Sequence, residues 1–444
     1  MPTPDGLSLE AWHLFTIFIS IIIAVISETT SIFTASIIGV AFVVLTKTLT
    51  PQEAYSGFSE SFILLIIVAF LIARAVIKSG LGKRLAFTII KYFGKSTLGL
   101  AYSITIADMF IAPAFPSNTA RSGVLYPIIN ALSADSGSKV ADGTRKKLGA
   151  YLMLVSMAGI TISSTMWLTA MAANPAGVKM ASNLGIDISF GSWAMAASLP
   201  TLVAFITIPL LLMKIFPPEL KKTPEAPKMA QEHLDKMGKV TKNEYITAAT
   251  FISMVLLWVL SDSLGLEKTA VAFMGLGVLM ISKIFTLEDL AHEGNALGTL
   301  VWFAILFSMS SHLNHLGFMT WLGAYISMAV TGFSWPIVYV ALVLGYVLIH
   351  YFFVSQTAQV LALFSIFLEV GIGAGVPGEM LALMLLFATN FSAIITPQGS
   401  SANVIYLGSG YITSSEVYKY GGVITLLNSV IYLTIGTAWM MLIL

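Results

Sequence analysis

The sequence predicts an all-α polytopic membrane protein, and three observations lead to this fold class. Of its 444 residues, 57% are hydrophobic and only 10% are Asp, Glu, Lys or Arg, whereas soluble proteins contain about 25% charged residues. The mean hydropathy is +0.87. Apolar runs of membrane-spanning character recur along the whole chain, whereas a soluble domain confines its apolar residues to one face of each helix. The first of these runs lacks a basic leader, so we expect it to be a mature span and not a signal peptide.

In the first half of the chain, five apolar segments are predicted to span the bilayer: 12–26, 32–45, 62–77, 148–163 and 193–215. A basic, amphipathic stretch over 78–95 is expected to lie along one membrane surface. Pro113 and Pro116 interrupt the region 98–132, which leaves two arms of about 15 residues, fewer than the roughly 20 that cross a bilayer. We therefore predict a re-entrant hairpin over 98–132. The hydroxyl- and amide-bearing segment 164–177 is predicted to be unwound.

The same order of segments begins again after a proline-rich hydrophilic stretch at 216–243, which we interpret as a cytoplasmic linker. The second half is predicted to contain the spans 245–260, 270–284, 300–311, 380–395 and 421–444, a hairpin over 337–371 and an unwound segment over 396–402. The sequence therefore predicts two repeats, at 1–215 and 244–444. Each has five spanning helices, a re-entrant hairpin and an unwound helix, as in transporters built from inverted repeats.

The distribution of basic residues predicts the orientation, because cytoplasmic loops carry an excess of Lys and Arg. Five spans per repeat is an odd number, so the second repeat is expected to be inverted relative to the first. Placing 78–95 in the cytoplasm puts 18 of the 23 basic residues inside and only Lys47, Lys179 and Lys268 outside. We therefore expect a protein of the cytoplasmic (inner) membrane with both termini extracytoplasmic. The first hairpin then opens from the cytoplasm and the second from outside.

A short polar motif lies at the tip of each predicted hairpin. The two motifs are Ser117, Asn118 and Thr119 in the first hairpin, and Ser355, Gln356 and Thr357 in the second. An irregular backbone at membrane depth is tolerated only where it is buried in protein or lines a cavity, and paired breaks of this kind indicate a transporter's binding site. Helix N-termini bind carboxylates, so two tips that meet would hold one carboxylate each of a dicarboxylate. The alternative is that the Ser and Thr side chains only cap their helices.

Two basic side chains near the tips are candidates for compensating the charge of an anionic substrate. An arginine at bilayer depth costs at least roughly 2.5–3.5 kcal/mol on insertion scales, so Arg121 is expected to be functional. The alternative is a structural ion pair with Asp108 on the other hairpin arm. His350 precedes the second tip and is either a second compensating charge or a buried histidine with ordinary core partners. Arg74, near the cytoplasmic end of its span, is expected to snorkel to the surface.

The tip motifs and the segments with Asn174-Pro175 and Thr396-Pro397 resemble those of the divalent anion/sodium symporter family of di- and tricarboxylate carriers. The stretch from Pro116 to Arg121 is most similar to the dicarboxylate exchangers, which include 2-oxoglutarate/malate translocators. The resemblance implies C4–C5 substrates such as malate, succinate or 2-oxoglutarate, an elevator mechanism and a homodimer. It also implies that the following residues contribute to the substrate site: Asn174, Thr396 and Pro397.

This sequence departs from the sodium-coupled members of that family at three positions: Pro113 replaces a hydroxyl, Gln356 replaces the second asparagine, and Arg121 adds a fixed charge. Two like charges about 4 Å apart cost on the order of 4 kcal/mol at an effective dielectric of 20, so a fixed cation disfavours sodium nearby. Without its anionic substrate, the site carries an unbalanced positive charge, so the empty carrier should cross the membrane slowly. We therefore predict sodium-independent antiport, with sodium-coupled symport as the alternative.

Other classes of protein fit the sequence less well. A membrane-embedded enzyme would need a nucleophile with its base or a set of metal ligands, and His292-Glu293 lacks the second histidine of a zinc-binding helix. An inorganic-ion antiporter would need buried carboxylates, for which Asp108 is the one good candidate. We expect a protein that is not an enzyme, with no catalytic residues, metal site, cofactor or nucleic-acid partner. Its expected partners are small dicarboxylates, the lipid bilayer and a second copy of the chain.

Overall fold

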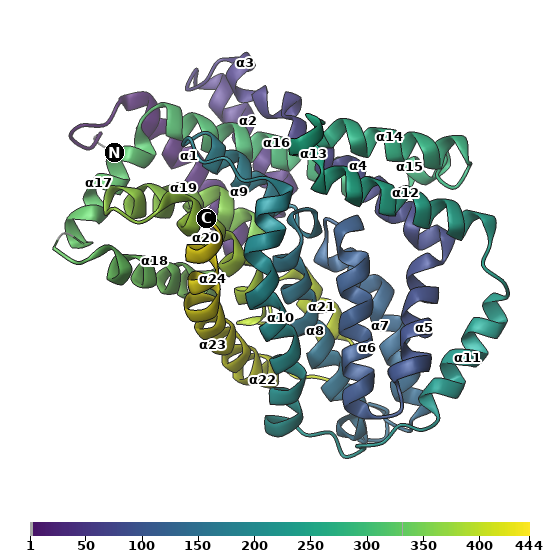
Figure 1. Ribbon diagram of the computed structural model, residues 1–444. Coiled ribbons are helices and arrows are strands. Elements are labelled where there is room, and N and C mark those ends of the chain that lie inside the picture. The colour runs from purple at the N-terminus through teal and green to yellow at the C-terminus, as the bar shows by residue number, and fades with distance from the viewer. Residues whose placement is uncertain (1–2, 331) are drawn as a thin grey trace.

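The computed structural model describes residues 3–330 and 332–444, and it confirms the all-helical membrane fold class (Figure 1). Within these residues, nine helices are long and apolar enough to cross a bilayer. Three shorter apolar helices accompany them: Ile32–Leu45, Lys268–Ile281 and Gly378–Ile394. The helices form two groups, and the candidate site lies where the groups meet.

The first group, which we call the scaffold helices, combines three helices from each half of the chain. They are α1 (Leu9–Ile26), α2 (Ile32–Leu45), α4 (Ser61–Ser79), α12 (Lys242–Val259), α14 (Lys268–Ile281) and α16 (Gly294–His315). Helix α4 packs against both α14 and α16, and α16 packs against α1 and α2. Most begin at a polar N-cap, such as Ser8 of α1 and Ser31 of α2, whose hydroxyls accept otherwise unpaired backbone N–H groups.

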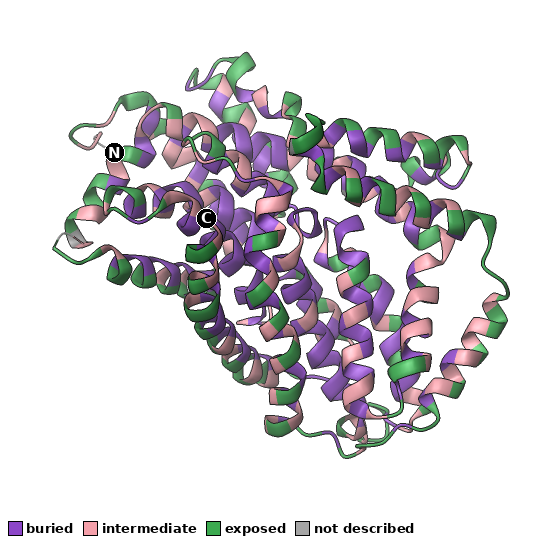
Figure 2. Cartoon of the chain, viewed as in Figure 1, coloured by how far each residue is buried: buried purple, intermediate pink, exposed green. Residues whose placement is uncertain are grey.

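The second group, the core helices, contains both hairpins. It comprises α6 (Thr97–Ile111), α7 (Asn118–Asp135), α8 (Gly149–Met166), α9 (Ala173–Ser182), α10 (Phe190–Ile215), α18 (Trp335–Ile349), α19 (Gln356–Gly373), α20 (Gly378–Phe391), α21 (Ser401–Gly408), α22 (Ser414–Glu416), α23 (Gly422–Ile431) and α24 (Thr437–Ile443). Helices α8 and α20 lie at its centre and are almost wholly buried (Figure 2). Each hairpin packs against a short helix of the other half, α7 on α21 and α19 on α9.

Two helices, the amphipathic α5 (Leu81–Phe93) and the apolar α17 (Phe318–Val330), connect the scaffold helices with the core helices. Helix α5 follows α4 and packs on α6, and α17 follows α16 and packs on α19. They lie at opposite edges of the molecule in Figure 1. Helix α5 lies wholly within the basic stretch predicted at 78–95, whereas no helix was expected at α17.

The hydrophilic stretch 216–243 is more ordered than a linker requires. It contains α11 (Ala226–Met237), which packs along α5, and the ring of His233 stacks on Phe87 with centroids 4.5 Å apart. Arg84 of α5 donates a hydrogen bond of 2.6 Å to Glu244 at the start of α12. The connection between the halves is therefore held against the molecule by packing and by an ion pair.

The same local structure precedes α4 and α16. Lys47 and Lys283, two residues beyond the ends of α2 and α14, both adopt a left-handed conformation with φ of 57°, which ends a helix by turning the chain away from its axis. Each is followed by a short helix with a capping box, α3 (Pro51–Ala54) and α15 (Leu287–Ala291). The repeated order of elements is thus visible in the fold, while the inverted relation of the two halves stays a prediction.

The two helix breaks differ in extent from the predicted unwound segments, 164–177 and 396–402. Helix α8 continues to Met166 and α9 begins at Ala173, so the break covers 167–172 and not 164–177. The second break runs from 392 to 400, because α21 already begins at Ser401. The Asn174-Pro175 pair is inside a helix because Pro175 occupies the first turn, where a missing backbone N–H has no intrahelical partner to lose.

Candidate functional site

The two hairpin tips meet inside the core helices. Ser117 and Ser355 have nearly the same backbone conformation, with φ and ψ of −143° and 119° for Ser117 and −147° and 124° for Ser355. Each hydroxyl accepts a 3.3 Å hydrogen bond from the backbone N–H three residues later, so both serines do cap their helices. Asn118 Nδ2 donates a 3.0 Å hydrogen bond to Gln356 Oε1, which joins the two tips across 238 residues of sequence.

A cavity of about 260 Å³ lies against this contact. All six tip residues line it: Ser117, Asn118, Thr119, Ser355, Gln356 and Thr357. Met171, Ala172, Ser400 and Ser401 come from the two helix breaks, and the scaffold helices contribute Phe70, Thr299 and Trp302. The volume suits a small organic molecule, and the cavity has polar groups on the core side and aromatic rings on the scaffold side.

Four helices begin at this cavity, which gives it a positive potential without a charged side chain in its lining. Helices α7, α9, α19 and α21 have their N-termini there, at Asn118, Ala173, Gln356 and Ser401. The first N–H groups of a helix have no intrahelical acceptor, and the helix dipole adds partial positive charge at that end. Convergent N-termini of this kind bind carboxylates and other anions.

Arg121 lies behind the first tip, in a closed polar network, and does not line the cavity. Its side chain is fully buried and donates hydrogen bonds of 2.8 Å to Asp108 Oδ2 and 2.7 Å to Asn118 Oδ1. Ser163 and Ser164 of α8 also accept from the guanidinium. The ion pair with Asp108 that the sequence left as an alternative is therefore present. Because the guanidinium of Arg121 donates to Oδ1 of Asn118, the Nδ2 of the same amide is directed toward Gln356.

His350 is also buried, and both of its ring nitrogens face acceptor oxygens. Nδ1 lies 2.6 Å from Gln359 Oε1, and Nε2 lies 3.0 Å from the backbone oxygen of Gly399. Gln359 Nε2 donates to the backbone oxygen of Tyr346 at 2.8 Å, which fixes the orientation of the amide. A hydrogen on each nitrogen would make the ring a cation, whereas a neutral ring can donate to only one of the two oxygens.

Gly399 makes the close approach of His350 to the second break possible. A Cβ atom at this position would lie 2.7 Å from the backbone oxygen of Ala393, and 3.1 Å from His350 Nε2. We therefore expect Gly399→Ala to displace His350 and to lower the transport rate at least about tenfold, since overpacking a tight site typically costs 1–3 kcal/mol. Uptake into liposomes measures the effect, with Gly408→Ala, which meets no atom within 4 Å, as the matched control. An unchanged rate for Gly399→Ala would show that the contact is dispensable.

Asn174 holds the first break together from behind and does not line the cavity. Its Nδ2 donates to the backbone oxygens of Ser164 at 3.0 Å and Trp167 at 3.3 Å, which are carbonyls freed by the end of α8. Asn403 does the same for the second break, with bonds of 2.8 Å to Ala393 and 3.0 Å to Thr396. These amides supply the partners that an interrupted helix at membrane depth requires.

Of the other predicted site residues, Thr119 lines the cavity, whereas Thr396 and Pro397 belong to the second helix break behind it. Thr396 is fully buried, and its carbonyl accepts from Asn403, while its hydroxyl has no hydrogen-bond partner among the described residues. Thr396 and Pro397 do not line the cavity, whereas Ser400 and Ser401 do, and Thr119 Oγ1 lies 2.5 Å from Ser401 Oγ. The sequence signal for Ser400 was a serine after glycine at the start of a helix, a typical N-cap.

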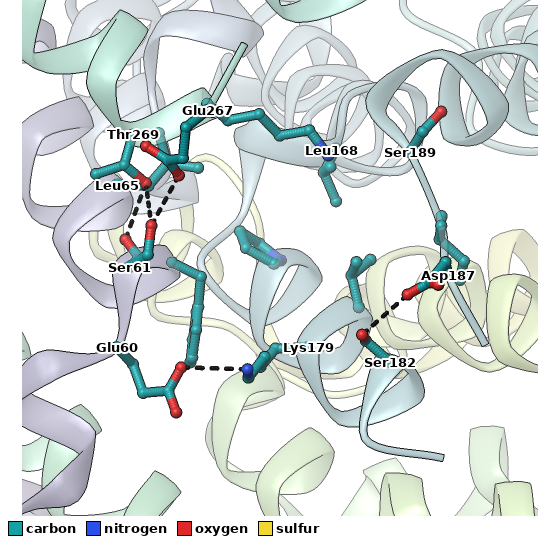
Figure 3. A pocket seen from close by; sticks show the side chains of 15 residues that line it. Glu60, Ser61, Leu65, Leu168, Lys179, Ser182, Asp187, Ser189, Glu267 and Thr269 are labelled. Carbon is teal, nitrogen blue, oxygen red and sulfur yellow. Dashed lines mark hydrogen bonds and ion pairs between the residues drawn. The ribbon is translucent and has the colours of Figure 1, made fainter. Parts of the chain in front are cut away.

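A second, larger cavity of about 550 Å³ lies at the N-terminal end of α4 (Figure 3). Three carboxylates line it: Glu60, Asp187 and Glu267. Lys179 of α9 points across the cavity to Glu60, and its Nζ lies 3.5 Å from the Glu60 carboxylate (Figure 3). The carboxylates outnumber the two lysines in the lining, so this cavity disfavours a dianion. Its importance is that the Glu60–Lys179 pair connects a scaffold helix to a core helix.

Two helical hairpins whose tips meet at one cavity, inside a polytopic helical fold, are typical of an integral-membrane transporter. Comparison with known proteins agrees: the family model described as the sodium:sulfate symporter transmembrane region matches residues 1–444. This chain belongs to that family, the divalent anion/sodium symporters, as its tip motifs predicted. Since this is a family of transporters, the chain is not an enzyme.

Relatives cover nearly the whole chain. It is 40% identical to the putative malate transporter YflS of Bacillus subtilis, over 99% of this chain and 92% of the relative. It is 41% identical to the chloroplastic dicarboxylate transporter 1 of Spinacia oleracea, over 99% of this chain and 78% of the relative. Among solved structures, the YdaH transporter of Alcanivorax borkumensis matches with a TM-score of 0.63 at 12% identity, over 89% of each chain, which shows a shared fold alone.

Proposed function

We propose that this protein exchanges small dicarboxylates of four or five carbons, such as malate, succinate or 2-oxoglutarate, across the cytoplasmic membrane. The observation that carries the proposal is the contact between Asn118 and Gln356, which brings both tips to one cavity with four helix N-termini. Each tip can hold one carboxylate through its hydroxyls and free N–H groups. The names of the relatives, a malate transporter and dicarboxylate transporters, support this class of substrate.

The proposed coupling is antiport without sodium. In this proposal His350 carries a positive charge close to the second tip, and Arg121 carries another, which Asp108 balances at 2.8 Å. Arg121 then acts by positioning the amide of Asn118, while His350 offsets part of the charge of a dianion. An empty carrier keeps the charge of His350 without the substrate's, so its return across the membrane is unfavourable and exchange is preferred.

The proposed movement is that of an elevator, in which the core helices carry the substrate past the scaffold helices. The grouping of both hairpins with α8, α9, α20 and α21 supports this division, and α5 and α17 are the connections that would bend. The proposal includes two inverted repeats at 1–215 and 244–444, a cytoplasmic linker at 216–243, extracytoplasmic termini and a homodimer formed by the scaffold helices.

Counterflow in liposomes tests the proposed function. Vesicles are loaded with unlabelled dicarboxylate, and labelled 2-oxoglutarate, malate, succinate or citrate is added outside, with and without sodium. We expect accumulation of label only in preloaded vesicles, and at the same rate with or without sodium. Uptake into vesicles without internal dicarboxylate that sodium stimulates would establish symport instead. Exchange of none of the four anions would contradict the proposed class of substrate.

The tip side chains should determine affinity. We expect Asn118→Ala and Thr357→Ala each to weaken binding about tenfold or more, because a hydrogen bond to a charged group contributes about 1.5–3 kcal/mol. Thr357→Ser keeps the hydroxyl and is the matched control. Binding of labelled substrate to the purified protein measures the effect, and thermal unfolding shows that each variant is folded. Parental affinity in both alanine variants would exclude the tips as the binding site.

A further inference from the structure

A cavity of about 510 Å³ connects the candidate site with the end of α4 that carries Lys78. It shares five lining residues with the central cavity: Phe70, Ser117, Thr119, Thr299 and Trp302. Farther along, it is lined by Arg74 and Ile77 of α4 and by Glu293 at the start of α16. The cavity of Figure 3 shares no lining residue with the central one, and its nearest α4 residue, Leu65, precedes Phe70 by five residues, or about 7.5 Å along the helix. The site therefore continues toward the end of α4 that carries Lys78, which the basic residues assign to the cytoplasm.

Arg74 is held in this passage differently from the other arginines. The chain has four arginines, and Arg84, Arg121 and Arg145 each donate hydrogen bonds to a carboxylate at 2.6 to 2.9 Å. Arg74 has only a longer ion pair, with Glu293 at 3.5 Å, and its Nε, like that of Arg121, has no hydrogen-bond partner among the described residues. Its side chain is 41% exposed, so the guanidinium is available to an anion in the cavity.

The position of Arg74 relative to the tips suits a first contact for the substrate. Arg74 lies one helical turn from Phe70, which lines the central cavity, so about 5.4 Å along α4 separates their positions. A planar guanidinium binds a carboxylate with two parallel hydrogen bonds, a better geometry than its present contact with Glu293.

We propose that Arg74 forms an anion-binding site in the passage, where a substrate carboxylate displaces Glu293 before the dicarboxylate moves on to the hairpin tips. This inference rests on the proposed function and adds a second site to it. Glu293 competes with the substrate for the guanidinium, keeps the empty passage neutral, and releases Arg74 only to an anion. Snorkelling to the surface, which the sequence indicated for Arg74, does not describe its place in the cavity lining.

Two substitutions with opposite expected effects test the proposal. Arg74→Gln should raise the KM for dicarboxylate about fivefold on the face that carries Lys78, because a half-exposed ion pair contributes up to about 1 kcal/mol. Glu293→Gln should lower that KM by a similar factor, since it removes the competing carboxylate. Initial rates of exchange in right-side-out and inside-out membrane vesicles give the KM on each face separately. The KM on the opposite face should stay unchanged in both variants.

Lys78→Gln is the matched control, because Lys78 lies one turn beyond Arg74 on the same helix and does not line the passage. Its ammonium donates a 2.6 Å hydrogen bond to Asp289 and holds the pKa of that carboxyl below its usual value. Lys78→Gln removes the same charge from the same helix end but should leave the KM unchanged. Raising the ionic strength should increase the KM of the parental protein more than that of Arg74→Gln.

The possible outcomes separate the passage site from the proposed function. If Arg74→Gln and Glu293→Gln shift the KM in the same direction, the pair only joins α4 to α16 and the inference is wrong. Equal KM values in the parental protein and both variants would also overturn it, while leaving dicarboxylate exchange intact. Should Arg74→Gln fail to fold, the fall in KM expected for Glu293→Gln still decides the matter. A parental protein that exchanges no dicarboxylate would overturn both proposals.

Discussion

Replacing Arg121 with alanine should abolish exchange and destabilise the folded protein by about 3–5 kcal/mol, because it leaves the buried carboxylate of Asp108 without its partner. The amide oxygen of Asn118 would also lose the guanidinium that donates to it at 2.7 Å and would keep only the donor Ser164 Oγ. Counterflow in liposomes measures the first effect. Thermal unfolding of the purified protein in detergent measures the second.

A double substitution separates the two roles of Arg121. The variant Arg121→Met with Asp108→Leu removes both charges, and an apolar pair of similar volume can be as stable as a buried ion pair. We expect its thermal stability to recover while its exchange stays lost, because Asn118 is no longer positioned by a guanidinium. Exchange at the parental rate in this variant would reduce Arg121 to a structural residue and would remove one support for antiport.

Cross-linking the scaffold helices to the core helices should stop exchange completely. The chain contains no cysteine, so Glu60→Cys and Lys179→Cys introduce the only reactive pair, at a contact where the original side chains lie 3.5 Å apart. A short bifunctional thiol reagent would join α9 to the start of α4. If the core helices must move past the scaffold helices, exchange ceases while substrate binding persists, and cleavage of the reagent restores exchange.

Arg145→Cys with Glu416→Cys is the matched control for the cross-link. These residues are also an ion pair, at 2.9 Å, but both lie among the core helices. Joining them should leave exchange unaffected, since the two positions move together. Continued turnover in fully cross-linked Glu60→Cys/Lys179→Cys protein would contradict movement between the two groups.

The hairpin tips could be predicted from the sequence because polar residues in an apolar region must face protein or a cavity. Asn118 and Gln356 stand out in this way, and their contact follows from two breaks that share one depth. The pair of Arg121 with Asp108 was also foreseeable as an alternative, because the two residues lie on opposite arms of one hairpin.

The remaining walls of the cavity could not be predicted, because tertiary packing alone brings them there. Phe70, Thr299 and Trp302 lie on scaffold helices whose sequences are typical of ordinary membrane spans. From the sequence alone, Trp302 would be interpreted as a packing residue. Asn174 was expected to contact the substrate, but in the structure it bonds to the carbonyls that the end of α8 leaves free. An amide can serve either purpose, and only its surroundings decide between them.

The matched backbone of the two tips, from Ser117 and from Ser355, does not make the cavity symmetric. Counting from these serines, the position of Arg121 is occupied in the second half by Gln359, and the position of His350 is occupied in the first half by Ala112. One end of the cavity is thus backed by a neutralised guanidinium and the other by the buried ring of His350. If the cavity holds a dicarboxylate as proposed, its two ends are inequivalent. A substrate with unlike termini, such as 2-oxoglutarate, would then have a preferred head-to-tail direction, and mirror-image forms of malate would bind with different affinities.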